Sequence, residues 1–224
     1  MKRVLENVAK LREKSRQYGD EISQLLGILP DVSPPRSGCF GMIFNHLTVT
    51  LELLSYYYSV WSSPSVKVSS VEMSTEERGR IKKENAERCV MALKWLFIDS
   101  LSSIEYSAKV SVASYGEGSP AKSLTKMKKG QHVYLSDIMR NSKDSNLIDD
   151  DEYDDWQNLI FLRNCIVHNN AVSESDRIFD IAGIRVAASA GEMIQGKLDF
   201  FAIVTGVAIE RYFAWVKALI RKLG

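Results

Sequence analysis

Three polar residues of one short segment, LRNCIVHNNAV, carry side chains that could cleave a phosphodiester. They are Arg163, Asn164 and His168. A histidine titrates near neutrality, so it can take a proton from a ribose 2′-hydroxyl or give one to the leaving 5′-oxygen. An arginine can bind a phosphate through two parallel hydrogen bonds and stabilise charge that develops on its oxygens. An asparagine can orient the substrate or fix the imidazole tautomer. The segment therefore predicts a site that cleaves RNA.

The residues around this cluster predict the helix that must position it. From Trp156 onwards, apolar side chains occupy most of the helical circumference, which is typical of a central and buried helix. We expect that helix over about residues 152–168. Gln157, Asn164 and His168 are spaced by seven and four residues, so they share its main polar strip. Something polar must face that strip.

Arg163 falls among the apolar side chains of the same helix, where an uncompensated guanidinium is costly to bury. It needs an anion, and Glu105 on an earlier helix is our first candidate for a carboxylate that approaches it. Two interpretations stay open. Arg163 binds a substrate phosphate, or it pairs with Glu105 for structural reasons alone. In the second case Asn164 and His168 cap the helix end, where a histidine is favoured by the negative pole of the helix.

The same segment resembles the signature of the HEPN superfamily, which has an arginine near the end of a helix, a polar residue, three further residues and a histidine. Asn169 directly after the histidine adds to the resemblance. The likeness covers most of the chain from about Ser74 to Leu223, because a hairpin and a terminal helix follow the motif in a compatible order. Ala171 departs from it, since a glycine is expected there in close relatives.

The resemblance implies an activity and a set of roles. Members with an intact motif are commonly metal-independent endoribonucleases, in which two subunits pair so that both motifs line one cleft. Arg163 would bind and polarise the scissile phosphate, His168 would transfer protons, and Asn164 would support them, with Glu105 and Asn169 as further supporting residues. The product would be a 2′,3′-cyclic phosphate. Such proteins resemble toxins or effectors of antiviral defence, so a homodimer and a cognate antitoxin or defence partner are expected.

Two other functions stay open beside the ribonuclease. A non-catalytic adaptor or nucleotide-sensing module of the same superfamily would keep the fold and use the cleft for binding, and fold alone does not separate these functions. A structural interaction protein would keep Arg163 paired with Glu105. Retention of both Arg163 and His168 favours the enzyme, because a scaffold has no chemical need for both residues.

The charge balance excludes a strongly basic nucleic-acid binder. The chain has 29 basic and 28 acidic residues, so no field of one sign covers it. Contact with RNA must therefore be local. Our candidates are Lys126, Lys128 and Lys129, in a connection over residues 115–131 that contains glycines and a proline; the alternative is an ordinary solvated loop.

The cysteines give no sign of a metal site. Cys39, Cys89 and Cys165 are far apart and lack the spacing of a zinc site, so we expect reduced thiols in a cytoplasmic protein and neither metal nor cofactor. Attack by a neighbouring 2′-hydroxyl requires no metal-activated water, which agrees with this. The most apolar stretches run short of the roughly 20 residues that span a bilayer, so no membrane association is expected.

Helical periodicity dominates the chain and predicts an all-α fold. We expect one domain over residues 1–224, a HEPN-like helical bundle. Its longest helix should begin at a capping box formed by Ser74 and Glu77. The expected helices cover about residues 2–29, 38–61, 74–111, 135–140, 152–168 and 198–223.

A small β-hairpin is expected before the last helix. Residues 177–195 contain short β-branched runs that are punctuated by Gly183 and Gly191, a pattern typical of two short strands and a turn. The hairpin would separate the motif helix from the terminal helix.

Two further features have ordinary explanations. The acidic run 149–155 stands where the motif helix begins, and negative charge is favoured at a helix start, although a protein-docking role is the alternative. His46 lies in an apolar helix and is expected to be a hydrogen-bonded core residue. His132 lies in a polar loop and has no evident partner.

Overall fold

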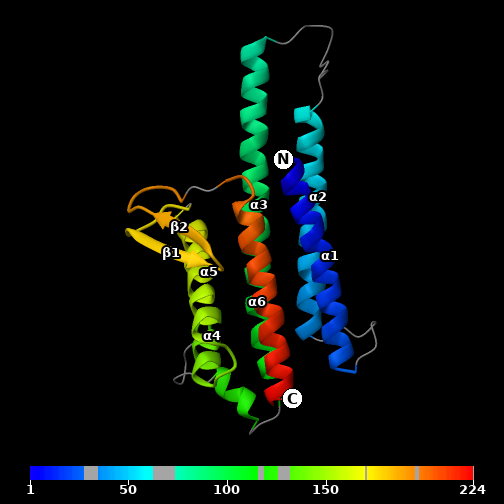
Figure 1. Ribbon diagram of the computed structural model, residues 1–224, viewed down its shortest axis with the longest axis vertical. Coiled ribbons are helices and arrows are strands. Elements are labelled where there is room, and N and C mark those ends of the chain that lie inside the picture. Colours follow the sequence, from blue (N-terminus) through cyan, green and yellow to red (C-terminus); the bar gives the residue numbers. More distant parts are fainter. Residues whose placement is uncertain are drawn as a thin grey trace.

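The computed structural model describes residues 1–27, 35–62, 74–115, 119–125, 132–169, 171–194 and 197–223. Helices dominate these residues, and two antiparallel strands precede the last helix (Figure 1), so the expected all-α fold with a small hairpin is confirmed. In chain order the elements are α1 (Lys2–Leu25), α2 (Pro35–Ser62), α3 (Thr75–Ala113), the 3₁₀ helix η1 (Pro120–Thr125), α4 (Leu135–Asp144), α5 (Asp150–Asn169), β1 (Arg177–Ile181), β2 (Ile184–Ala188) and α6 (Phe200–Leu223).

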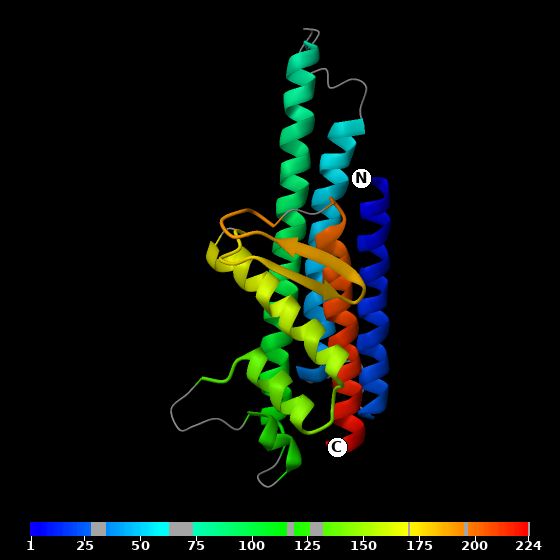
Figure 2. The same ribbon diagram turned by 60° about the vertical axis from the view of Figure 1, so that its left-hand side comes forward.

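Four long helices form an elongated bundle. Helix α1 packs against α2 and α6, and α3 also packs against both α2 and α6 (Figures 1 and 2). Aromatic side chains fill one part of the interior: the Tyr18 and Phe213 rings stack with their centroids 3.8 Å apart, and the Phe40 ring lies 5.4 Å from that of Tyr212. Burial of such large rings contributes much of the stability of a helical core. No helix among the described residues is both long and apolar enough to span a membrane.

Helix α3 begins where the sequence predicts it. The hydroxyl of Ser74 accepts a hydrogen bond from the backbone N–H of Glu77 at 3.1 Å, which satisfies one of the donors that a helix start leaves free. The helix continues without interruption to Ala113 and carries Glu105 in its buried second half. The longest helix of the fold thus supplies the carboxylate that we expected near the motif.

The motif helix α5 is not central, contrary to our expectation. Together with α4 and the hairpin it lies on one side of α3 and α6, outside the four-helix bundle (Figures 1 and 2). Its Asn164 and His168 are exposed, and 43% of Val167 is exposed as well. The central helix is instead α6, whose side chains from Ala202 to Leu219 include a long series of fully buried ones.

The hairpin explains why a peripheral helix is apolar around most of its circumference. One face of α5 buries Trp156, Leu159 and Leu162 towards the bundle. Phe161 lies on another face and meets the ring of Phe179 in β1 edge to face, with centroids 5.4 Å apart. Because the hairpin covers this second face, the apolar pattern alone could not distinguish a central helix from one sandwiched at the edge.

The two strands are shorter than the range in which we expected the hairpin. They pair in antiparallel register from Arg177 opposite Ala188 to Ile181 opposite Ile184. The turn between them uses Ala182 and Gly183, both with positive φ values, 48° and 83°. The following residues Ala190 and Met193 instead form isolated bridges to the segment that directly follows α5.

Candidate functional site

The acidic run before the motif stabilises the start of α5. The backbone N–H of Glu152 donates to the carboxylate of Asp149 at 2.8 Å, and the N–H of Asp149 donates to the carboxylate of Glu152 at 3.2 Å. Asp150 also forms an ion pair with Lys143 of α4, with 2.8 Å between nitrogen and oxygen. These reciprocal caps and the favourable helix dipole account for the charges at this end of the run, as expected.

Asp155 fixes α5 to both the hairpin and α6. Its carboxylate accepts one hydrogen bond from the backbone N–H of Ala182 at 2.7 Å and another from Nε of Arg211 at 2.8 Å. Arg211 also approaches Glu152 at 3.6 Å. Sequence reasoning missed this network, although an arginine in the middle of the apolar terminal helix was a signal that a buried carboxylate had to face it.

A second set of polar contacts joins α5 to β1. Asn158 donates from its amide to the backbone oxygen of Asp180 and accepts from the guanidinium of Arg177, both at 2.8 Å. The same guanidinium lies 4.4 Å from the centre of the Phe161 ring, within the range of a cation–π contact. The motif helix is therefore held rigidly along its first two thirds, and the motif lies at the end that follows.

Arg163 points towards α3, where Glu105 lies. Its Nη1 is 3.8 Å from a carboxylate oxygen of Glu105, so the carboxylate expected to approach the motif does so. This distance is that of an ion pair without a hydrogen bond. Glu105 instead accepts a hydrogen bond of 2.7 Å from Nζ of Lys109, one turn further along α3.

The guanidinium of Arg163 has no hydrogen-bond partner in the part of the chain that the structure describes. Only 28% of its side chain is exposed, its Nε is inaccessible to solvent, and none of its donors is hydrogen bonded to the residues that the structure describes. A guanidinium has five N–H donors, and a buried donor that is left unpaired is destabilising. Arg163 is therefore charged, largely buried and still able to bind an acceptor.

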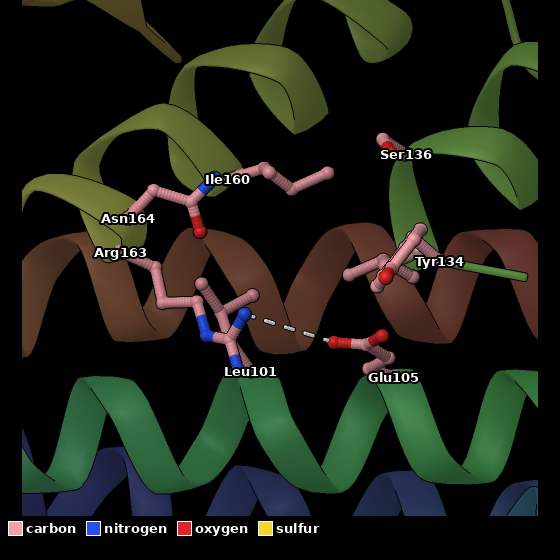
Figure 3. Close-up of a pocket in the computed structure, with 8 residues that line it drawn as sticks. Leu101, Glu105, Tyr134, Ser136, Ile160, Arg163 and Asn164 are labelled. Carbon is pink, nitrogen blue, oxygen red and sulfur yellow. Dashed lines mark ion pairs between the residues drawn. The ribbon is translucent and has the colours of Figure 1, made fainter. Parts of the chain in front are cut away.

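A small pocket opens in front of this guanidinium. It encloses about 100 Å³ between α5, α3 and the start of α4. Figure 3 shows Arg163 and Asn164 on one side of the pocket, and Glu105, Tyr134 and Ser136 on the opposite side. The residues that line it are Leu101, Glu105, Tyr134, Leu135, Ser136, Ile160, Arg163 and Asn164.

His168 lies outside this pocket. It is exposed in the last turn of α5, four residues beyond Asn164 and therefore on the same face of the helix. Relative to Arg163 it is displaced by roughly 7.5 Å along the helix and about 140° around it, from the standard helical repeat. A single chain thus brings Arg163, Asn164 and Glu105 together and leaves the imidazole one turn away in solvent.

The residues that end α5 have local partners. The amide of Asn169 donates to the carboxylate of Glu174 at 2.9 Å, so Asn169 does not line the pocket. The backbone N–H of Ala171 donates to the carbonyl oxygen of Cys165 at 2.8 Å, and Ala171 has a φ of 69°. This left-handed conformation is the one that glycine adopts most easily at a helix end, which gives a physical reason why glycine would suit this position.

The three cysteines are buried, and none forms a disulfide. Burial raises the pKa of the Cys39 thiol to about 12. Burial also raises the pKa of the Cys165 thiol, with a further contribution from the negative charge of Glu174. Because the thiolate is the reactive form, neither residue is suited to act as a nucleophile near neutral pH. Among the described residues, no cluster of three or more histidine, cysteine or acidic side chains could hold a metal ion.

The other residues that the sequence suggested, three lysines and two histidines, are not among the described residues that line the pocket. Lys126, Lys128 and Lys129 lie outside the described residues. The expectation that His46 is a hydrogen-bonded core residue is wrong in part, because its Nδ1 is buried without a partner among the described residues and its side chain as a whole is only partly buried. His132 is exposed and does not line the pocket.

Tyr134 and Ser136 are pocket residues that sequence reasoning did not select. The start of a short helix near Leu135 was expected, but its position against Arg163 depends on how α4 folds back on α3 and α5. No local pattern in the sequence signals such a long-range contact.

The chain was also compared with known proteins, and no family model, no curated protein and no solved structure matches it.

Proposed function

We propose that the chain is a metal-independent endoribonuclease that acts as a homodimer, as a toxin or an antiviral defence effector in the cytoplasm. One observation carries the proposal: a largely buried arginine with no hydrogen bond to the described residues faces a small pocket, and an exposed histidine lies one helical turn beyond the rim of that pocket. Such an arginine suits a phosphate, and such a histidine is free to exchange protons with a substrate.

The proposed reaction is attack by a ribose 2′-hydroxyl on the adjacent phosphorus. His168 removes the 2′-hydroxyl proton, the new 2′-oxygen to phosphorus bond forms, and the bond from phosphorus to the 5′-oxygen breaks. The leaving oxygen takes up a proton, so the products are a 2′,3′-cyclic phosphate and a 5′-hydroxyl. Arg163 stabilises the negative charge on the non-bridging oxygens, and Asn164 at the rim orients the substrate.

A second copy of the chain supports this chemistry in two ways. It would bring another exposed His168 to the pocket of the first copy, because a two-fold axis beside the exposed end of α5 brings the two motifs together. It would also supply a second imidazole that can donate a proton to the leaving oxygen and so raise the rate. Lys126, Lys128 and Lys129 are proposed contacts to the RNA backbone, and a cognate antitoxin or defence partner would control the activity.

The alternative function is a non-catalytic adaptor or nucleotide-sensing module. The observation that favours it is the absence of His168 from the pocket lining, together with the ion pair of Arg163 and Glu105. A binding module would use the pocket and leave His168 without a role. The two functions therefore differ in what the loss of the histidine does.

The test is digestion of mixed cellular RNA by the purified chain in the presence of EDTA, with analysis of the fragment ends. The wild type should cut the RNA and leave 2′,3′-cyclic phosphates. His168→Ala should reduce the rate by at least about 100-fold, the usual contribution of a positioned proton-transfer group.

His132→Ala is the matched control, since His132 is exposed and lies outside the pocket lining. It should cleave like the wild type. Equal cleavage by His168→Ala would exclude the proposed role of the histidine, and a wild type that does not cut would favour the binding module.

A further inference from the structure

The pocket in front of Arg163 presents donors for a negatively charged group. The guanidinium contributes its two terminal nitrogens, neither of which is hydrogen bonded to a described residue. Opposite it, the first turn of α4 contributes the hydroxyl of Ser136 (Figure 3). The backbone N–H groups of Leu135 and Ser136 likewise have no hydrogen bond to the described residues. Free N–H groups and the positive end of a helix favour an anion.

The acidic group nearest to this first turn is already neutralised. Asp137 accepts a hydrogen bond from the backbone N–H of Tyr134 at 3.1 Å and another from Arg140 at 2.9 Å. Its carboxylate is buried and does not line the pocket. It therefore caps the helix and pairs with a base, and does not occupy the space in front of Ser136.

Among the described residues, Glu105 is the carboxylate that lines the pocket. It holds Arg163 only through an ion pair at 3.8 Å, while its hydrogen bond of 2.7 Å goes to Lys109. An anion that arrives at Arg163 would break no hydrogen bond of the guanidinium. Glu105 would keep Lys109 as its counter-charge and would be repelled by the new negative charge. The carboxylate thus competes weakly with any anion for the same arginine.

The size of the pocket selects a single small anion. Sites for drug-sized molecules enclose about 300 Å³ or more, so a space of about 100 Å³ matches a single small group better than a whole nucleoside. It suits one phosphate group with its attached chain leaving past Asn164, which is exposed at the rim.

We propose that this pocket is a subsite for one phosphate group, which is bound by Arg163, the hydroxyl of Ser136 and the free N–H groups at the start of α4, with Glu105 as its resident competitor. The inference rests on the proposed function and adds to it the residues that hold the phosphate. The phosphate could belong to an RNA chain or to a free nucleotide, and the binding chemistry is the same in both cases.

Binding to the full chain can be measured without cleavage. A fluorescent 2′-O-methyl RNA cannot react, and its anisotropy reports binding, while inorganic phosphate and a nucleoside 3′-phosphate are added as competitors. Arg163→Gln should weaken binding of all three ligands by at least about 10-fold, the loss of a charge-assisted forked contact. Glu105→Gln should tighten phosphate binding by about threefold or more, because the competing charge is gone. Ser136→Ala should weaken it by a few-fold.

Arg78→Gln is the matched control. Arg78 is an exposed arginine of α3 that lies roughly 40 Å along the helix from Glu105, and its loss should leave binding unchanged. Displacement of the RNA by both small competitors would assign the subsite to the phosphate itself. Tight binding of the nucleoside phosphate together with no binding of RNA would assign it to a free nucleotide.

Different experimental results would reject the phosphate subsite and the ribonuclease function. Wild-type affinities in both Arg163→Gln and Glu105→Gln would overturn the subsite, even if the chain cleaves RNA. The affinity changes described above, in a chain that leaves unmodified RNA intact, would support the subsite and reject the ribonuclease. Because Glu105→Gln should increase affinity, misfolding of one variant cannot imitate the expected pattern.

Discussion

Arg211 and Arg163 are equally buried, yet they differ in how their charge is satisfied. Each has 28% of its side chain exposed. Arg211 donates to Asp155 at 2.8 Å and also approaches Glu152. Within the described segments, Arg163 has an ion pair at 3.8 Å and a buried Nε without a partner. The same residue type at the same exposure is therefore hydrogen bonded to a carboxylate in one place and, among the described residues, has no hydrogen bond in the other.

The difference indicates what each arginine is for. Asp155 and Arg211 join α5 to the hairpin and to α6, so their pair maintains the position of the motif helix. Arg163 makes only the long ion pair with Glu105 among the described residues, and its side chain lines a pocket. Groups that lower the stability of the fold and have no structural role are expected at functional sites. We therefore assign stability to the first arginine and binding to the second.

The largest stability effect should come from Arg211. Arg211→Gln leaves the carboxylate of Asp155, of which only 7% is exposed, without its cationic partner. The free energy of unfolding should fall by about 3 kcal/mol, as for other buried pairs that lose one member. Arg163→Gln should change it by less than about 1 kcal/mol, because its ion pair has no hydrogen bond. Urea unfolding followed by circular dichroism measures both.

Equal losses of unfolding free energy in Arg163→Gln and Arg211→Gln would contradict this comparison. If Arg163→Gln destabilised the chain as strongly as Arg211→Gln, the ion pair with Glu105 would be structural, and the interpretation of Arg163 as a binding residue would lose its main support. A stabilised Arg163→Gln variant would strengthen it, since removal of an unsatisfied buried charge is then favourable.

A smaller effect should appear in alkaline solution and should arise in part from a thiol in the bundle interior. Burial raises the pKa of Cys39 from an ordinary 9.0 to about 12, and burial also raises the pKa of its neighbour Tyr212. The folded state keeps the thiol proton at a pH where the unfolded chain has lost it. Stability from this thiol is therefore complete below about pH 9 and falls as the pH rises towards 12, by at most about 1.4 kcal/mol per pH unit.

Urea unfolding under reducing conditions over roughly pH 8 to 11 measures this slope. Cys39→Ala should make the slope shallower, whatever its effect on absolute stability, while Arg163→Gln should leave the slope as in the wild type. An unchanged slope in Cys39→Ala would show that other groups cause the alkaline loss.

Local patterns in the sequence were enough to predict the elements. Ser74 and Glu77 predicted the start of α3, and the structure shows the hydrogen bond between them. Gly183 predicted the turn of the hairpin, where it adopts a φ of 83°. The position of α5 could not be predicted in this way, because Phe161 looks like a core residue whether the hairpin or the bundle covers it.

The site was predictable only in part, for a related reason. Arg163, Asn164 and His168 could be selected from their chemistry, and Glu105 could be selected because a buried arginine needs an anion. Ser136 was not found, since nothing near it in the sequence indicates that the start of α4 faces α5. The separation of His168 from the pocket also follows from packing, because a motif on a helix shows spacing but not which face is covered.

The central claim is that Arg163 and His168 of two copies complete one ribonuclease site. The most direct test mixes Arg163→Gln with His168→Ala under conditions in which the subunits exchange, and then measures RNA cleavage. Each variant alone should be nearly inactive. The mixture should recover part of the wild-type activity, because a mixed dimer has one cleft with Arg163 from one copy and His168 from the other, and lacks only the second imidazole. Mixed dimers that form but cleave no better than either variant alone, or a wild type that is monomeric by light scattering at micromolar concentration, would contradict the account.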